Sequence, residues 1–516
     1  MSILPTIDLY NSLSSGKNPT DSRLNEIVKK LRSHKKKSII VCDSNDTNTQ
    51  LIVNGINSIL DNYEKTISLK NPSYIKQGDS SKVNNLIKEM QDGDVGALIT
   101  YKANPSYNLS NSKAFNAALS KVDLTISSSL YNDETASLMD YVCAESHNLE
   151  SWGDLHPSHN VYSLMQPTIA PLFNTRQFEE TLLRWIDQED YHSFLSDFWR
   201  NKGVKWEQAV HDGFFIYNDI EPEIKSISTL DKGILSFESS SKEIELVIYE
   251  KIGIGDGTQA NNPWLQEFPD PISRSCWDNY LTISASNARD FNLKNWNVSN
   301  GALNGSVVNL KANDILIKDV PVLIQPGQAK NTIGLALGYG RTKSGKAANN
   351  VGINAYPLLQ TKEVSIELVE GKEHEFASIQ LHHTMMGRDM VKETPLSDYL
   401  QDMKKIKEGS SAELSDNKRT KYPTFKGDLP SDKLSLYDEH DLKTGHFWNL
   451  SIDLTSCTGC GECVISCQAE NNTPVVGKAE MRKSRDMHWM RIDRYYSSEM
   501  TKEKAKIEDI SAIKMY

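Results

Sequence analysis

The chain has 516 residues, of which 38% are hydrophobic and 24% charged, and its formal net charge is −11. This length suits about two to four domains with sizeable cores, and the acidic balance argues against nucleic acid as the main partner. No apolar stretch approaches the roughly 18 residues of a membrane span, and the first residues lack the pattern of a signal peptide. We therefore expect any membrane to be reached through partner subunits.

The first 202 residues alternate between helical and strand-like patterns. Residues 1–20 are polar and rich in turn formers, so they are expected to be a linker-like lead. Strands are expected at 38–42, 66–69, 97–100 and 124–127, and helices at 23–37, 51–60, 83–90, 114–119, 178–187 and 191–202. This alternation predicts a parallel α/β sheet.

Two places in this region carry polar groups that could bind or react. The loop 42–48 follows a predicted strand and precedes a helix, which is a natural anion site, but no glycine-rich fingerprint is present and a simple helix cap is favoured. Glu145, His147 and Glu150 could form an acid–base set. A structured loop is the favoured interpretation of these three residues.

The middle of the chain turns from mixed to β-rich. Strands are expected at 244–249, 307–310, 320–324, 332–337 and 364–368. Between them, Gly340 to Lys346 match G-x4-G-K, most of a phosphate-binding P-loop. Ala347 replaces the required Ser or Thr, and the following residues form helices poorly, so nucleoside triphosphate hydrolysis is excluded here.

Residues 388–445 are charged and are interpreted as a linker. His382 and His383 lie just before it, and adjacent residues of a strand point to opposite faces, so structural or surface roles are favoured over metal binding. The separate cysteines Cys42, Cys143 and Cys276 are expected to be ordinary buried thiols.

The chemistry of the chain is concentrated in residues 457–467, hereafter the cysteine run. Its four cysteines follow the spacing C-x2-C-x2-C-x3-C and are Cys457, Cys460, Cys463 and Cys467. This is the spacing of bacterial ferredoxin iron–sulfur ligands, whereas zinc sites usually close with two separated C-x2-C pairs. The first three thiols would bind one cluster and the fourth a second cluster. The run therefore needs further ligands from elsewhere.

A basic stretch follows the cysteine run. It contains Arg482, Lys483, Arg485, His488, Arg491 and Arg494. This stretch could offset the charge of a cluster or dock an acidic partner, and a solvated surface is an equally good interpretation.

Several stretches resemble the large iron–sulfur subunit of bacterial alternative complex III. They are residues 163–176, 322–332, 338–341, 382–389 and 457–467 with the five residues after it. The resemblance covers nearly the whole chain from about residue 35. It implies a molybdopterin-oxidoreductase-like part fused to a ferredoxin-like part, with Cys457, Cys460 and Cys463 binding one 4Fe-4S cluster and Cys467 completing a neighbouring one.

The resemblance also implies a division of this α/β chain into five parts. Residues 1–202 would form an α/β molybdopterin-oxidoreductase-like domain, 203–304 a mixed connecting region, 305–388 a β-rich, barrel-like pterin-dinucleotide-binding-like domain, 389–445 a linker and 446–516 the start of a ferredoxin-like 4Fe-4S domain. The family's long N-terminal portion and its three further cysteine groups are not found here. We therefore expect a piece of a longer protein with an incomplete ligand set for its clusters.

The implied function is an electron relay in a membrane-associated, quinol-oxidising respiratory complex, passing single electrons to a cytochrome or oxidase. The expected partners are a quinol-oxidising membrane subunit and c-type cytochrome subunits at the periplasmic face of the inner membrane. We expect neither molybdopterin nor an independent catalytic site, and no cofactor-binding residues besides the four cysteines. Two alternatives stay open: an active molybdopterin oxidoreductase acting on a small inorganic substrate, and an interaction scaffold with structural zinc.

Overall fold

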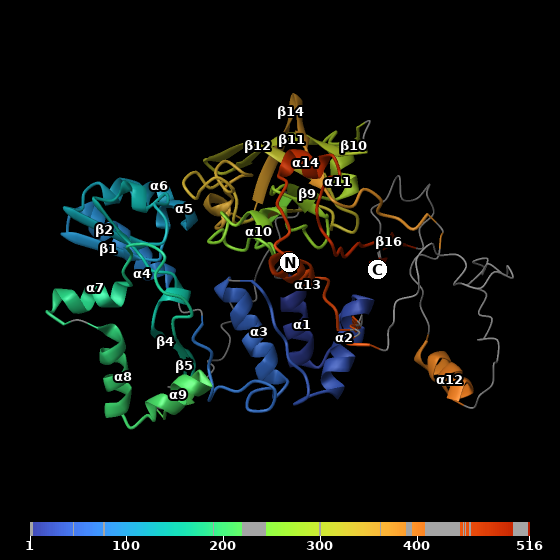
Figure 1. The fold of residues 1–516 in the computed structure, drawn as a ribbon. Coiled ribbons are helices and arrows are strands. Elements are labelled where there is room, and N and C mark those ends of the chain that lie inside the picture. The colour runs from blue at the N-terminus through green and yellow to red at the C-terminus, as the bar shows by residue number, and fades with distance from the viewer. Residues whose placement is uncertain are drawn as a thin grey trace. The chain divides into compact units, whose positions relative to one another are not determined.

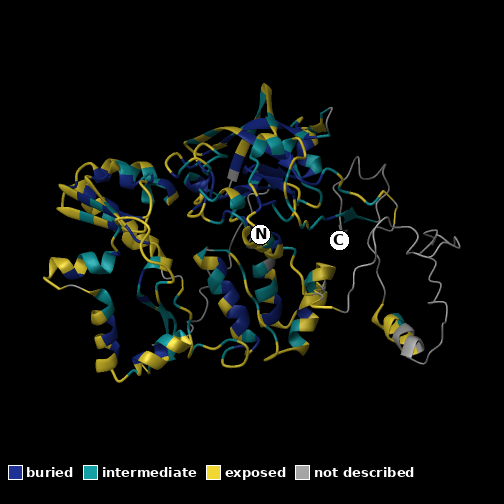
Figure 2. Cartoon of the chain, viewed as in Figure 1, coloured by how far each residue is buried: buried dark blue, intermediate teal, exposed yellow. Residues whose placement is uncertain are grey.

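The chain forms two compact units, Met1–Glu243 and Ile244–Tyr516, each of mixed α/β structure (Figure 1). The computed structural model describes residues 4–44, 46–75, 78–188, 190–218, 244–298, 301–361, 363–386, 388, 395–407, 444–446, 448, 450–453, 456–498 and 514–515. Among these residues, no helix is both long and apolar enough to cross a bilayer. Figure 2 shows buried residues gathered in the large sheet of the second unit and among the first three helices of the first.

The first unit begins with three helices, α1 (Leu4–Ser15), α2 (Ser22–Ser33) and α3 (Thr47–Ile59). They share a core that includes Ile7 and Leu13 of α1. The predicted linker-like lead over residues 1–20 is therefore wrong, because Ile7 and Leu13 pack against apolar side chains of α2 and α3.

The strand expected at residues 38–42 is also absent. The side-chain amide of Asn57 accepts a hydrogen bond from the Ile40 backbone N–H at 3.0 Å. It also donates one to the backbone carbonyl oxygen of Ile40 at 2.8 Å. A side chain of α3 thus satisfies the backbone that a neighbouring strand would otherwise pair. The strand expected at 66–69 is reduced to one isolated bridge between Tyr63 and Ile67.

A three-stranded parallel sheet follows, in the order β1 (Ala97–Tyr101), β2 (Leu124–Ser129), β3 (Tyr141–Ala144). Helices α4 (Ser80–Asp92), α5 (Pro105–Asn108) and α6 (Ser112–Leu119) accompany it, and the short helix η1 (Ala136–Leu138) precedes β3. Apolar side chains of α4 and α6 pack together with Leu98 of β1. The prediction of a parallel α/β sheet is confirmed for these strands.

The first unit ends in an antiparallel sheet of β4 (Gly153–Ser158), β5 (Val161–Met165) and β6 (Phe214–Ile216), preceded by η2 (Asn148–Glu150). Its helices are α7 (Phe178–Trp185), α8 (Tyr191–Asn201) and α9 (Trp206–Asp212), and the predicted helices at 178–187 and 191–202 are confirmed. The buried indole of Trp199 donates a hydrogen bond to the Asp154 carboxylate at 2.8 Å, which joins α8 to β4.

The second unit is built on a seven-stranded sheet. Its order is β10 (Asn295–Asn297), β11 (Leu303–Ala312), β12 (Ile315–Ile324), β9 (Leu281–Ile283), β13 (Thr332–Ala336), β7 (Ile244–Tyr249), β14 (Glu363–Glu375). Because β14 also pairs with β11, six of the seven strands close into a ring. Leu281, Ile283, Leu310 and Leu335 are completely buried in this sheet. The predicted β-rich texture is confirmed.

Short elements complete the second unit. They are α10 (Pro263–Glu267), β8 (Ser275–Cys276), α11 (Ala285–Asp290), η4 (Tyr356–Leu358), β15 (Ala377–Ser378), α12 (Leu396–Lys407), α13 (Glu462–Glu470), α14 (Lys478–Arg482), β16 (Tyr496–Ser497) and β17 (Lys514–Met515). Helix α12 lies within the predicted linker, and residues 408–443 of that linker lie outside the described residues. The five-part division of the chain stays a prediction.

Arg482 at the end of α14 fixes the C-terminal segment to the large sheet. Its guanidinium donates to the carbonyl oxygens of Leu303 at 2.9 Å and Phe376 at 3.1 Å, and also to the side chain of Asn304. Its side chain is 12% exposed, so the loss of these bonds would leave buried acceptors unpaired.

We expect Arg482→Ala to lower the free energy of unfolding of the second unit by about 2 kcal/mol. Arg485→Ala is the matched control: its side chain is 67% exposed and forms a surface ion pair with Glu480, so a loss of less than about 0.5 kcal/mol is expected. Urea denaturation of both variants measures the difference. Equal effects would show that the carbonyl contacts of Arg482 add no stability.

Candidate iron–sulfur site

The cysteine run leads directly into helix α13. Cys457 and Cys460 precede the helix, and Cys463 and Cys467 lie four residues apart on it, so the last two thiols share one side. Cys457 and Cys463 are exposed, Cys460 and Cys467 are half-buried, and all four are free thiols. A short segment thus presents four accessible sulfur ligands.

Backbone conformation and hydrogen bonds suit this segment to thiolate ligands. Gly459 and Gly461 adopt left-handed φ angles of 69° and 79°, which side chains other than glycine rarely tolerate. The Gly459 N–H donates to Sγ of Cys457 at 3.4 Å, and the Asn471 side-chain amide donates to Sγ of Cys467 at 3.5 Å. Hydrogen bonds to sulfur stabilise negative charge on a cluster and its ligands and tune its reduction potential.

The donor chemistry of the run fits an iron–sulfur cluster, while a closed metal site is not formed. Within the described part of the chain, no three Cys, His, Asp or Glu side chains are gathered closely enough to bind a metal ion. The side-chain amide of Gln468, directly after Cys467, is buried. Neither its nitrogen nor its oxygen has a hydrogen-bond partner within the described part of the chain. The four cysteines as ligands stay a prediction that their chemistry supports.

The basic stretch after the cysteine run forms several ion pairs with neighbouring acidic residues. Lys483 and Arg485 both pair with Glu480 at 2.7 Å, and Arg491 pairs with Asp493 at 2.9 Å. Arg482 is bonded to backbone carbonyls as described above. Lys483 and Arg485 are 51% and 67% exposed, so these ion pairs agree with the solvated-surface interpretation of the stretch.

Arg494 and His383 form a second internal contact of this stretch. An Arg494 guanidinium N–H donates to Nδ1 of His383 at 2.7 Å, while Gln380 bonds both the N–H and the carbonyl oxygen of Arg494. Burial, and secondly the positive charge of Arg494, lowers the pKa of His383 to about 4. A neutral His383 therefore accepts a bond here, in agreement with the predicted structural role.

This contact predicts a pH dependence of stability. A histidine in an unfolded chain has a pKa of about 6.5, so between roughly pH 6.5 and 4 the unfolded state binds more protons than the folded state. Stability supplied by neutral His383 is thus present above pH 6.5 and is lost as the pH falls towards 4. We expect His383→Gln to flatten this loss and His446→Gln, at an exposed histidine of the same unit, to leave it unchanged, as measured by urea denaturation across this pH range. A steep loss that persists in His383→Gln would contradict this assignment.

The candidate acid–base residues of the first unit act as backbone caps. The Glu150 carboxylate accepts from the His147 backbone N–H at 2.8 Å, and the His147 ring accepts from the Leu149 N–H at 3.1 Å. Glu145 is buried, which raises its pKa, and it accepts bonds from Ser128 and from the Phe178 backbone. The structured-loop interpretation is therefore favoured by the geometry.

Two further loops have ordinary structural roles. In loop 42–48, the Asp46 carboxylate caps α3 by accepting from the Thr49 N–H at 3.0 Å, as predicted. In the near P-loop, the Asn261 side chain packs against Gly345 and accepts from the Ala347 N–H at 3.2 Å. The backbone of this near P-loop therefore bonds to other parts of the protein, and turns follow the loop in the chain.

The separate cysteines differ from the expectation in part. Cys276 is buried, and burial raises the pKa of its thiol, as expected for an unreactive core cysteine. Cys42 and Cys143 are only half-buried. They provide matched control thiols for experiments on the cysteine run.

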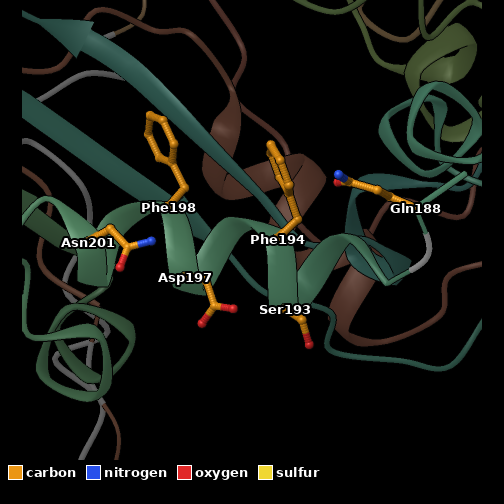
Figure 3. A pocket seen from close by; sticks show the side chains of 6 residues that line it. All are labelled: Gln188, Ser193, Phe194, Asp197, Phe198 and Asn201. Atoms are coloured by element: carbon orange, nitrogen blue, oxygen red, sulfur yellow. The ribbon is translucent and has the colours of Figure 1, made fainter. Parts of the chain in front are cut away.

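A hollow lies along α8 in the first unit (Figure 3). It is lined by Gln188, Ser193, Phe194, Asp197, Phe198 and Asn201. Figure 3 shows Phe194 and Phe198 pointing to one side of the helix and Ser193 and Asp197 to the other. The lining therefore combines two aromatic rings with four polar side chains.

Comparisons with known proteins give partial similarities. No protein-family model matches the chain. It is 36% identical over 91 residues, 17% of this chain, to the menaquinone reductase molybdopterin-binding-like subunit of Nitratidesulfovibrio vulgaris (strain Hildenborough). It is also 39% identical over 57 residues, 11% of this chain, to the iron–sulfur cluster-binding subunit of menaquinone reductase from the same organism. The matches span 13% and 20% of those two relatives.

Among solved structures, acetylene hydratase from Pelobacter acetylenicus resembles the chain with a TM-score of 0.38 and 12% identity, covering 53% of this chain and 42% of the hydratase. A score this low does not assign a fold.

Proposed function

We propose that this chain is an electron-transfer component that binds iron–sulfur clusters through its cysteine run, within a membrane-associated respiratory complex. The observation that carries the proposal is the run itself: four thiols at ferredoxin spacing, on a loop with two left-handed glycines and an N–H···S bond. Similarity to a molybdopterin-binding-like and to an iron–sulfur subunit of menaquinone reductase supports a chain that combines both kinds of part.

The proposed roles of the residues follow from ligand chemistry. Cys457, Cys460 and Cys463 would bind one 4Fe-4S cluster as thiolates, and Cys467 would serve a neighbouring cluster, with the missing ligands supplied from outside the run. A bound cluster supplies one-electron chemistry. The chain orients the thiolates and donates hydrogen bonds to sulfur. No acid or base is required for this function.

The proposed partners are a quinol-oxidising membrane subunit and c-type cytochrome subunits at the periplasmic face, as implied by the resemblance to the iron–sulfur subunit of alternative complex III. Electrons would then flow from quinol to a cytochrome or oxidase. The relatives named above are reductases of menaquinone, for which electrons flow the other way. Mixing the complex that contains the cluster-loaded chain and its membrane partner with menaquinol and, separately, with menaquinone distinguishes the two directions by which mixture changes the oxidation state of the cluster.

Anaerobic reconstitution of the 516-residue chain with iron, sulfide and a small external thiol, which can occupy the ligand position that the run leaves open, tests cluster binding directly. The expected result is visible absorption and an electron paramagnetic resonance signal that appears on one-electron reduction and is lost on reoxidation. Binding of zinc with no visible absorption, and no uptake of iron, would favour the structural-zinc scaffold and contradict the proposal.

The main alternative is an active molybdopterin oxidoreductase acting on a small inorganic substrate. One relative is a molybdopterin-binding-like subunit, which is the reason for considering this alternative. We propose that residues 305–388 form a pterin-dinucleotide-type domain that holds no pterin. A denatured and oxidised extract of the purified protein should show no pterin fluorescence, and a stoichiometric pterin signal would favour the alternative.

A further inference from the structure

The phenyl ring of Phe268 lies between two glycines, one of them in the cysteine run. A Cβ atom added at Gly461 would lie 2.7 Å from Cζ of this ring, and a Cβ added at Gly253 would lie 2.8 Å from Cδ1. Contacts this short are possible only because both positions lack a side chain. Phe268 is 7% exposed and directly follows α10. Its buried ring therefore packs against the loop that carries Cys460.

Glu267, the residue before Phe268, binds the backbone that follows α13. Its carboxylate accepts hydrogen bonds from the backbone N–H groups of Val476 at 3.1 Å and Gly477 at 2.8 Å, and from the Trp277 indole at 3.3 Å. Glu267 is 3% exposed, and three N–H donors compensate for the burial of its charge. These charge-assisted bonds hold the start of α14.

Trp264, at the beginning of α10, supplies the third contact. Its indole N–H donates to the Thr473 carbonyl oxygen at 2.7 Å, just after α13 ends. The three contacts therefore lie at Gly461 before α13, at Thr473 after it, and at Val476 and Gly477 ahead of α14. Helix α13, with Cys463 and Cys467, is bracketed by them.

From these contacts we infer that Trp264, Glu267 and Phe268 form a clamp, here the α10 clamp, that positions the cysteine run and shields the Cys460 side of it from water. The three are positioning residues: none supplies a metal ligand. For its effect on a cluster the inference rests on the proposed function, because solvent exposure and ligand geometry set the reduction potential of iron–sulfur clusters. The effect of the clamp on the accessibility of the thiols can be measured with no cluster bound.

The first experiment measures alkylation of individual thiols by iodoacetamide in the cluster-free full chain, followed by mass spectrometry. We expect Phe268→Ala to raise the alkylation rate of half-buried Cys460 about tenfold, as the loss of one local contact of about 1.4 kcal/mol would do. Phe268→Leu should restore part of the protection. Phe173→Ala, at a 77% exposed phenylalanine of the first unit, and the rate at Cys143 serve as controls. Unchanged protection of Cys460 in Phe268→Ala would overturn the clamp.

A second variant covers the case in which Phe268→Ala does not fold. Glu267→Gln keeps the size of the side chain and removes its charge, and hydrogen exchange at the Val476 and Gly477 amides should then become about tenfold faster. Exchange at those amides as slow as in the parent chain would overturn the role given to Glu267.

The cluster-loaded protein separates this inference from the proposed function. In Phe268→Ala we expect a shifted reduction potential and altered paramagnetic resonance line shape, with partial return in Phe268→Leu. A parent chain that binds clusters, together with an unshifted potential in Phe268→Ala, would overturn the clamp alone. A parent chain that takes up no iron would overturn the proposed function, and the alkylation result would still decide the clamp.

Discussion

The Cys460→Ser variant of the full chain is expected to lose nearly all of the iron and acid-labile sulfide that the parent binds after anaerobic reconstitution. A serine hydroxyl stays protonated at neutral pH, whereas a cysteine provides the soft thiolate that iron–sulfur clusters require. Cys460 is half-buried and lies between two left-handed glycines. Iron and sulfide analysis with the visible spectrum measures the loss.

The controls for this prediction come from the chain itself. Cys143→Ser alters a half-buried thiol of the first unit and should leave iron binding unchanged. Cys457→Ser and Cys463→Ser should behave like Cys460→Ser, because the three thiols would serve the same cluster. Full iron binding by Cys460→Ser, or an equal loss in Cys143→Ser, would contradict the assignment of this run.

Gly461→Ala is expected to lower the free energy of unfolding of the second unit by about 3 kcal/mol. A left-handed φ of 79° costs a residue with a side chain about 1 kcal/mol, and the added methyl group would lie 2.7 Å from the Phe268 ring, which overpacks a buried contact. Because Phe268 is itself held against Gly253, the ring has little room to move away.

Gly459→Ala separates the two causes. Gly459 has a similar φ of 69°, but no atom lies within 4 Å of the position that its Cβ would take. Its substitution should therefore cost only the backbone part, about 1 kcal/mol. Urea denaturation of the two variants gives the difference, and equal losses would show that the Phe268 contact does not hold the loop.

The local parts of this structure could be predicted from the sequence. The parallel strands β1 and β2 and helices such as α7 and α8 follow from periodic apolar residues with turn formers between them. The ligand chemistry of the cysteine run is equally local, because all four thiols lie within eleven consecutive residues. The cap at Asp46 could be predicted for the same reason.

The failures have a common physical cause. Residues 38–42 have the composition of a strand, but the Asn57 side chain, far along the chain, satisfies the backbone of Ile40. The α10 clamp joins Phe268 to Gly461 and Glu267 to Gly477, and no local pattern encodes contacts between segments so distant in sequence. Asn262 followed by Pro263 did carry a signal for the start of α10, because asparagine is a favourable cap and proline a favourable first helical residue.

The most direct test of the account is the iron and acid-labile sulfide content, with paramagnetic resonance, of the 516-residue chain purified anaerobically from cells grown with iron, together with the partners that supply its missing cluster ligands. We predict iron and sulfide in equal amounts and a signal that appears on one-electron reduction. Zinc in place of iron, with no sulfide and no reducible signal, would contradict the assignment of the cysteine run as the site of electron transfer.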